Sequence, residues 1–191
     1  CHFELKNNVK AKEIFEELLP RYKKAWGNKN DLSIVIERMI CVCHFELKNY
    51  VKAKEICEEL LPRFKKAWGN EHRRYLDIER MVGCCYLELK NYVKAKEIFE
   101  ELLPRYKKAW GDENKFYVDI ERLIGCCHFE LKNNVKAKEI FEELLPRYKK
   151  ELGDENKFSV DMERLISCCH FELKNYVKAK ESFEELLPRY K

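Results

Sequence analysis

Long apolar runs and blocks of like charge are both missing from this sequence. Its longest uninterrupted apolar stretch is only a few residues, whereas a membrane-spanning helix needs about 20. Lysine and glutamate are interleaved rather than clustered, and the net charge is a modest +4. Neither a nucleic-acid-binding tail nor a membrane-surface patch is indicated, so we expect no nucleic-acid partner and no membrane partner.

What the sequence contains instead is a repeat with a period of 42 residues. Near-copies of KNYVKAKEIFEELLPRYKKAWG, which runs from Lys90 to Gly111, begin at Lys6, Lys48, Lys132 and Lys174. Such repetition is typical of stacked similar units rather than separate globular domains. The expected array consists of a partial repeat 1–31, full repeats 32–73, 74–115 and 116–157, and a truncated repeat 158–191.

Each unit is expected to be a helical hairpin. Asn114 can cap a helix that begins at Lys115, and that helix should stop near Lys132. Asn133 suits either a left-handed position that closes the first helix or the N-cap of the second. Apolar residues mostly three or four apart indicate that both helices are amphipathic. They are Val118, Ile120, Leu123, Ile124, Cys127 and Leu131, then Ala137, Ile140, Phe141, Leu144, Leu145 and Tyr148.

Glycine and proline recur at fixed points of the second helix. Glycine should end that helix by adopting a positive φ angle, at Gly27, Gly69, Gly111 and Gly153. A proline lies within the same helix, where it removes a backbone hydrogen bond and costs about 3 kcal/mol. The prolines are Pro20, Pro62, Pro104, Pro146 and Pro188. Because the apolar periodicity resumes after the proline, we predict a continuous but kinked helix; the alternative is a break after Leu103.

The stretch LIGCCHFELKNNVKAKEIFEELL, Leu123 to Leu145, resembles the tetratricopeptide repeat. That signature has a small Gly, an aromatic residue three positions later, then Ala, then an aromatic residue four beyond it. The matching residues are Gly83, Tyr86, Ala95 and Phe99 in one unit and Gly125, His128, Ala137 and Phe141 in the next. The departures are Cys41 and Ser167 in place of Gly, Cys57 in place of Phe, and the absence of the leading Trp.

The 42-residue length is similar to that of kinesin light chain repeats, whose junction resembles Leu152-Gly153-Asp154-Glu155. The resemblance implies an all-α fold, a right-handed α-solenoid of antiparallel helix-turn-helix hairpins. It also implies that the first helix of each hairpin lines the concave face of the superhelix.

One stripe of the first helix lies outside the predicted core and is available for binding. In one unit it carries Asp119, Arg122, Cys126, Phe129 and Glu130. Arginine suits bidentate recognition of carboxylates, which favours a protein or peptide ligand. The predicted groove residues are Arg38, Arg80, Arg122, Arg164, Asp77, Asp119, Asp161, Phe45, Phe129, Phe171, Glu46, Glu88, Glu130 and Glu172.

Ten cysteines recur at the repeat period, mostly in adjacent pairs. Matching positions in neighbouring repeats should lie roughly 8–10 Å apart, beyond disulfide reach. We therefore predict reduced thiols and a cytoplasmic location. Zinc binding by Cys126-Cys127-His128 is disfavoured, because three consecutive helical residues cannot converge on one ion. Cys84, Cys126 and Cys168 lie on the groove stripe, where a redox-sensing thiol is an alternative.

Nothing in the pattern predicts an enzyme. An active site needs one asymmetric group of residues, whereas the acidic residues recur in every unit. Glu101 and Arg105 are interpreted as a solvated helix pair worth about 0.2–0.5 kcal/mol. Histidines are expected to pack at helix interfaces and tryptophans to anchor helix ends. These residues are His2, His44, His128 and His170, with Trp26, Trp68 and Trp110.

The predicted function is a protein-interaction scaffold that binds a peptide or helix in the groove, without a cofactor or metal. The alternative is a structural spacer or an engineered array with no ligand. Near-identity of Lys6–Trp26 with Lys90–Trp110 favours recent duplication or design, without separating the two. Exposed helices at both ends also predict end-to-end self-association.

Overall fold

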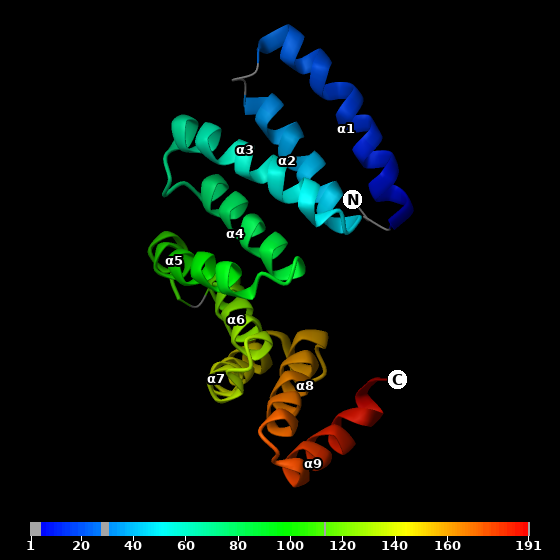
Figure 1. The fold of residues 1–191 in the computed structure, drawn as a ribbon, viewed down its shortest axis with the longest axis vertical. Helices are drawn as coiled ribbons and strands as arrows, with labels where there is room; N and C mark the ends of the chain where they lie inside the picture. The colour runs from blue at the N-terminus through cyan, green and yellow to red at the C-terminus, as the bar shows by residue number, and fades with distance from the viewer. Residues whose placement is uncertain (1–4, 28–30, 113, 191) are drawn as a thin grey trace. The chain divides into compact units, whose positions relative to one another are not determined.

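The computed structural model describes residues 5–27, 31–112 and 114–190, and the regular secondary structure of these ranges is entirely helical (Figure 1). The elements in this part of the chain are α1 (Leu5–Trp26), α2 (Asp31–Glu46), α3 (Tyr50–Trp68), α4 (Arg73–Glu88), α5 (Tyr92–Trp110), α6 (Lys115–Glu130), α7 (Asn134–Leu152), α8 (Lys157–Glu172), α9 (Tyr176–Leu186) and the 3₁₀ helix η1 (Leu187–Tyr190). The predicted all-α fold of helical hairpins is confirmed. His2 lies outside the described residues.

The chain divides into two compact units, Cys1–Arg105 and Tyr106–Lys191. In the first unit α1 packs on α2, α2 on α3, and α3 on α4, in the order of the sequence (Figure 1). Their apolar faces meet in a core that includes Ile34 of α2, Leu60 and Phe64 of α3, and Ile78 and Val82 of α4. Each inner helix is therefore held by contacts with its sequence neighbours.

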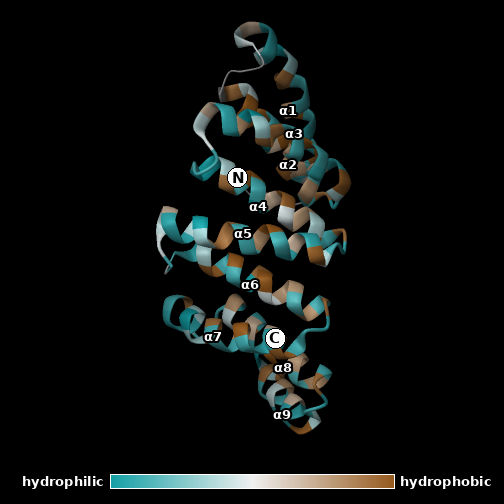
Figure 2. Cartoon of the chain, turned by 60° about the vertical axis from the view of Figure 1, so that its left-hand side comes forward, coloured by the Kyte–Doolittle hydropathy of each residue, from teal (hydrophilic) through white to brown (hydrophobic). Residues whose placement is uncertain are grey.

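The second unit follows the same plan, with α6, α7, α8 and α9 packed consecutively. Val118 of α6, Phe141 and Leu144 of α7, and Met162 and Leu165 of α8 belong to its buried core. Figure 2 shows the underlying pattern: hydrophobic residues recur along the helices between hydrophilic ones. That periodicity gives each helix an apolar face for its neighbour and a polar face for water.

Most of the predicted apolar positions of α6 and α7 are buried, but Leu131 is exposed. Leu131 is the C-cap residue that directly follows α6, so its side chain leaves the helical stripe. On α7, Ile140 and Leu145 are half-buried beside the core rather than within it.

The turn between α6 and α7 places the left-handed residue at Lys132, with φ 62°. The backbone N–H of Lys132 donates to the carbonyl of Phe129, and that of Asn133 donates to the carbonyl of His128. These two bonds form a Schellman motif that closes α6. Asn133 has φ −86° and is the N-cap of α7, so of its two predicted roles the left-handed C-cap is wrong.

The other predicted helix ends are confirmed. The side-chain oxygen of Asn114 accepts a hydrogen bond from the backbone N–H of Phe116 at 2.9 Å and caps α6. Gly27, Gly69, Gly111 and Gly153 all have positive φ. At Gly153 the φ of 89° reverses the chain after α7 with little steric penalty, because glycine has no Cβ.

Four prolines lie inside uninterrupted helices, at Pro20 in α1, Pro62 in α3, Pro104 in α5 and Pro146 in α7. The alternative of a break after Leu103 is therefore wrong, while the kink itself stays a prediction. The last copy differs: α9 ends at Leu186, and Pro188 lies in η1.

Cys41 on α2 and Cys57 on α3 form a disulfide. The prediction of uniformly reduced cysteines is wrong for this pair, because the bond joins non-equivalent positions within one hairpin. The free cysteines of the described residues are Cys43, Cys84, Cys85, Cys126, Cys127, Cys168 and Cys169.

The tryptophans divide into two classes. Trp68 is half-buried and stacks on His72 with ring centroids 5.8 Å apart, and half-buried Trp110 lies 4.7 Å from Tyr106. Both anchor helix ends as predicted. Trp26 makes the equivalent contact at the end of α1, 5.1 Å from Tyr22, but it is 59% exposed, so it packs less completely than the other two.

Candidate binding surface

The predicted groove residues lie on the first helix of each hairpin, namely α2, α4, α6 and α8. On α6, Asp119, Arg122 and Phe129 are half-buried, and Glu130 at the helix end is exposed. This intermediate exposure fits a stripe that lies beside the core rather than within it. The corresponding residues of α4 follow the same pattern, with Asp77 and Arg80 half-buried and Glu88 exposed.

Within the second unit the stripes of α6 and α8 lie close enough to influence each other. Burial raises the pKa of the Cys126 thiol, Arg122 of the same helix opposes this rise, and Asp161 and Arg164 of α8 also act on it. Such electrostatic influence indicates that the charged groups of Asp161 and Arg164 lie near the Cys126 thiol. A raised pKa also disfavours Cys126 as a redox-sensing thiol, because the thiolate is the reactive form.

The groove arginines of the second unit are paired with aspartates on their own helices. Nε and Nη2 of Arg122 donate to Oδ1 of Asp119 at 3.2 and 2.7 Å. The same atoms of Arg164 donate to Oδ1 of Asp161 at 3.0 and 2.7 Å. Burial opposes the charge of Arg122, but Asp119 and its neighbours raise its pKa overall. A ligand carboxylate would therefore compete with an aspartate already in place.

The predicted aromatic residues of the groove differ in exposure. Phe45 lies edge-on to Tyr50 with centroids 5.2 Å apart, and Phe129 packs against the core of the second unit. Phe171 makes a similar edge contact with Tyr176 at 5.5 Å but is 55% exposed. Phe171 therefore offers the largest apolar contact area among the predicted phenylalanines.

The predicted glutamates lie at the C-terminal ends of their helices. Glu46, Glu88, Glu130 and Glu172 are all exposed. Oε2 of Glu172 lies 3.7 Å from Nζ of Lys132, which belongs to the turn between α6 and α7. These carboxylates are accessible to a basic partner without disturbing the core.

Sequence reasoning missed a recurring contact on a different edge of the hairpins. Nη1 of Arg105 on α5 donates to Oε2 of Glu79 on α4 at 2.5 Å. Nη2 of the same residue donates to the backbone carbonyl of Asn70, in the turn before α4. One side chain thus ties two helices and a turn together. The predicted pair of Arg105 with Glu101 is not observed.

This contact recurs throughout the chain and is here called the Arg–Glu clamp. It consists of Arg63 with Glu37, Arg105 with Glu79, Arg147 with Glu121, and Arg189 with Glu163. In each pair the glutamate precedes the arginine by 26 residues. Because both residues recur with the repeat period, this constant spacing can be read from the sequence alone. Burial raises the pKa of Glu79 and the charge of Arg105 opposes that rise, so the carboxylate depends on its partner.

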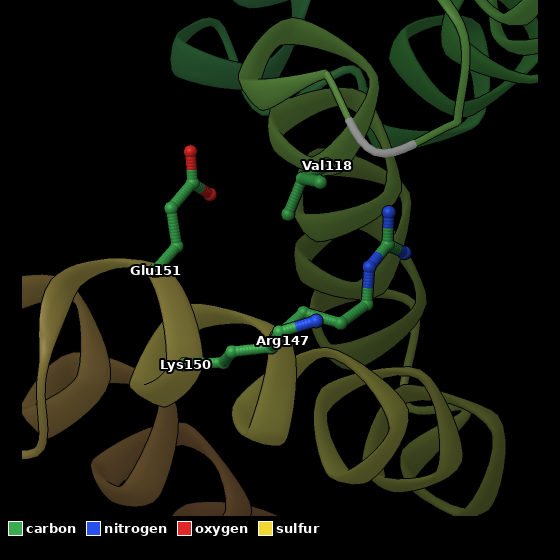
Figure 3. Close-up of a pocket in the computed structure, with 4 residues that line it drawn as sticks. All are labelled: Val118, Arg147, Lys150 and Glu151. Carbon is green, nitrogen blue, oxygen red and sulfur yellow. The ribbon is translucent and has the colours of Figure 1, made fainter.

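A cavity of about 280 Å³ opens beside the clamp of α6 and α7 and is lined by Val118, Arg147, Lys150 and Glu151. In Figure 3, Arg147 and Glu151 extend from α7 with Val118 of α6 beside them. Arg147 already donates to Glu121 and to the carbonyl of Asp112. The cavity therefore contains a structural arginine rather than a dedicated ligand site.

The histidines were predicted to pack at helix interfaces. His44 and His170 are buried at helix interfaces, as predicted, and His128 is half-buried.

Within the ranges that the structure describes, no three His, Cys, Asp or Glu residues could hold a metal ion. In the same ranges no helix is both long and apolar enough to cross a bilayer.

A family model described as tetratricopeptide repeat matches residues 31–108. These residues are tetratricopeptide repeats. The same 42-residue unit recurs on both sides of the match, which extends the tetratricopeptide pattern recognised in the sequence. A search of curated proteins finds no match.

Solved structures support the tetratricopeptide fold over nearly the whole chain. Nearly identical TPR-like repeats of a kinesin light chain from Podosopora anserina align with a TM-score of 0.77 and 14% identity, covering 97% of this chain and 88% of that one. BtubC (BKLC) from P. vanneervenii aligns with a TM-score of 0.78 and 14% identity, covering 96% and 73%. At these identities the similarity establishes the fold alone.

A Rap protein complexed with competence and sporulation factor also aligns, with a TM-score of 0.73 and 12% identity. The alignment covers 98% of this chain and 50% of that protein. The tetratricopeptide units of this chain thus correspond to about half of the Rap protein.

Proposed function

We propose that the chain is a protein-interaction scaffold that binds a peptide or helix of a partner on the stripes of its first helices, α2 and α4 in the first unit and α6 and α8 in the second. The observation that carries this proposal is the repetition of partly exposed charged and aromatic residues outside the core. A binding surface built in this way can extend over several hairpins. The Rap protein that shares the fold was solved in complex with another factor, which supports a binding role.

The charges of the stripes suggest the chemistry of the ligand. Arg122 and Arg164 are each held by an aspartate, whereas Glu88, Glu130 and Glu172 are exposed at helix ends. A partner with basic residues and an apolar anchor would meet exposed carboxylates and the open ring of Phe171. We therefore propose a basic amphipathic peptide or helix over an acidic one.

A charge-reversal experiment tests this proposal. The groove variant combines Glu88→Lys, Glu130→Lys and Glu172→Lys, which reverse exposed charges and leave the core intact. The matched control makes the same charge change on the second helices, with Glu97→Lys, Glu139→Lys and Glu181→Lys. Affinity-captured proteins are identified by mass spectrometry and then retested as purified partners by titration calorimetry.

The proposal expects a purified partner that binds the wild type and the control alike but binds the groove variant at least about tenfold more weakly. Equal weakening by both variants would show that net charge, not the stripe, determines binding. If neither variant alters a partner, or no partner survives purification, the alternative of a structural spacer is supported.

A further inference from the structure

We propose that Cys41 and Cys57 form a reversible redox site that closes the α2–α3 hairpin in place of an aromatic contact. Their Cα atoms are 6.6 Å apart, within the range of about 4.4–6.8 Å usual for disulfides. Both side chains are fully buried in the core of the first unit. This inference does not depend on any ligand of the binding stripes.

The next hairpin shows what normally occupies these two positions. Gly83 on α4 faces Phe99 on α5, and the phenylalanine is fully buried. A Cβ added to Gly83 would lie 2.6 Å from a ring carbon of Phe99, closer than real Cβ contacts allow. The ring therefore requires a glycine at this position. The same holds for Gly125 and Phe141, where an added Cβ would also lie 2.6 Å from a ring carbon.

In the α2–α3 hairpin both members of this pair are exchanged together. Cys41 has a Cβ that a phenylalanine ring would meet, and Cys57 supplies a smaller side chain instead of that ring. The exchange removes a buried aromatic contact and introduces two thiols close enough to bond. The last hairpin changes one member only: Ser167 stands at the glycine position, and the phenylalanine position keeps Phe183, which is 37% exposed.

The chemistry requires an oxidant, for which we name a low-molecular-weight disulfide such as oxidised glutathione. One cysteine thiolate attacks a sulfur of this disulfide, forms a mixed disulfide and releases one small thiolate. The second cysteine thiolate attacks the protein sulfur, forms the Cys41–Cys57 bond and releases the other small thiolate. The two released thiolates take up the two protons that the cysteines lost. The cysteines are thereby oxidised by two electrons, and the small disulfide is reduced.

Closing this bond joins α2 and α3 across the turn between them and restricts the unfolded chain, which stabilises the folded hairpin. The reduced hairpin has neither the bond nor the aromatic ring of its neighbours. Because both sulfurs are buried, exchange with a small thiol requires transient opening of the helices. Reduction in native buffer should therefore be much slower than in denaturant.

The test compares the whole chain after equilibration with oxidised glutathione or with dithiothreitol. Free thiols are then alkylated in denaturant and the peptides are mapped by mass spectrometry. We expect two fewer reactive thiols in the oxidised sample, a linked pair of peptides that contain Cys41 and Cys57, and a melting temperature higher by about 6–12 °C.

Two variants separate this site from the other thiols. Cys41→Gly combined with Cys57→Phe restores the contact of the neighbouring hairpins and should melt at the same temperature in both buffers. Cys84→Ser combined with Cys126→Ser removes two half-buried thiols and should retain the full difference. Cys57→Phe alone should be less stable than the double variant, because Cys41 then obstructs the ring.

The inference is overturned if the oxidised and reduced wild type have equal thiol counts, or if the linked peptides contain other cysteines. It is also overturned if the Cys41→Gly, Cys57→Phe variant loses as much thermal stability in dithiothreitol as the wild type.

Discussion

Lys132 holds a left-handed backbone conformation that usually belongs to glycine. Its equivalents Lys48, Lys90 and Lys174 have φ between 60 and 63°, so every described turn of this type repeats the conformation. A left-handed conformation costs an L-residue about 1–2 kcal/mol because Cβ approaches the following carbonyl. The Schellman hydrogen bonds of the turn offset this cost.

Replacing Lys132 with glycine should therefore stabilise the chain. We expect Lys132→Gly to raise the free energy of unfolding by about 0.5–1 kcal/mol, since glycine relieves the strain but makes the unfolded chain more flexible. The control Lys136→Gly, at an exposed position of α7, should lower it by about 1 kcal/mol. Urea unfolding followed by circular dichroism measures both; equal losses in the two variants would contradict the prediction.

Buried histidines should make stability sensitive to mild acid. Burial and the nearby Lys138 and Lys178 lower the pKa of His170 below 6.5, although Glu142 opposes them. The unfolded chain therefore binds the proton more readily, and stability falls as the pH drops through 6.5. Burial also lowers the pKa of His44.

In His170→Gln the loss of stability between about pH 7.5 and pH 5.5 should be smaller than in the wild type. Adding His44→Gln should reduce the loss further, because the second buried imidazole no longer titrates. Thermal melts across this range provide the measurement, and a double variant with the wild-type pH profile would refute the assignment.

Among the helices, the Arg–Glu clamp gives specificity that apolar packing alone lacks. In the first unit Arg105 joins α5 to α4 and to the turn before α4, so it fixes the offset of the two helices along their axes. Glu79 is half-buried and its pKa is raised by burial, so either charge left alone would be poorly solvated.

Removing the clamp carboxylate should be costly, whereas removing the carboxylate one helical turn from Arg105 should not. We expect Glu79→Ala to destabilise the chain by about 1–2 kcal/mol, because the guanidinium loses a charged hydrogen bond. Glu101→Ala, at an exposed site, should stay within about 0.5 kcal/mol of the wild type. Comparable losses in the two variants, measured by denaturant unfolding, would favour the pair within α5.

Features that depend on residues close together in the sequence were predicted, and contacts between distant residues were not. Helix positions, the Asn114 cap and the glycine ends depend on local chemistry, and the sequence predicted them. The position of the left-handed residue was harder to predict. Asparagine tolerates that conformation better than lysine, so Asn133 was considered for it instead of the adjacent Lys132. The clamp was missed because Arg105 was paired with Glu101, four residues earlier on the same helix. The disulfide was missed because only cysteines at matching positions of neighbouring repeats were compared.

For the binding stripes the sequence predicted which helices carry them and which residues escape the core. It did not show that Arg122 and Arg164 would be held by Asp119 and Asp161. Each aspartate precedes its arginine by three residues on the same helix. At that spacing an arginine can either pair with the aspartate or extend into solvent, and the sequence alone does not decide between the two. The preference for a basic ligand was added to the predicted peptide or helix because of this pairing, and it stays a proposal.

At the scale of the whole molecule, α9 presents an apolar surface. Phe171, Tyr176 and Phe183 line a cavity of about 450 Å³ there, and Val177 and Leu187 are both 72% exposed. Exposed apolar surface of this kind promotes association, and the end-to-end self-association expected from the sequence stays a prediction.

We expect the chain to associate as its concentration rises, and Val177→Glu with Leu187→Glu to weaken this association at least about tenfold. The control combines Val93→Glu with Val135→Glu, whose side chains are exposed on α5 and α7, and should associate like the wild type. Light scattering coupled to size exclusion measures the mass at each concentration. A wild type that remains monomeric at the highest concentration would disprove the proposed contact.

The constant spacing of the clamp also bears on how such a gene can change its length. Because each glutamate precedes its arginine by 26 residues within a 42-residue period, a recombination event that inserts or deletes one whole period restores every pair at the junction. The crossover point can fall anywhere in the unit. Events of another length that fall between a glutamate and its arginine change this spacing and expose the product to misfolding, so over that part of the unit the clamp favours growth and loss of the array in whole units.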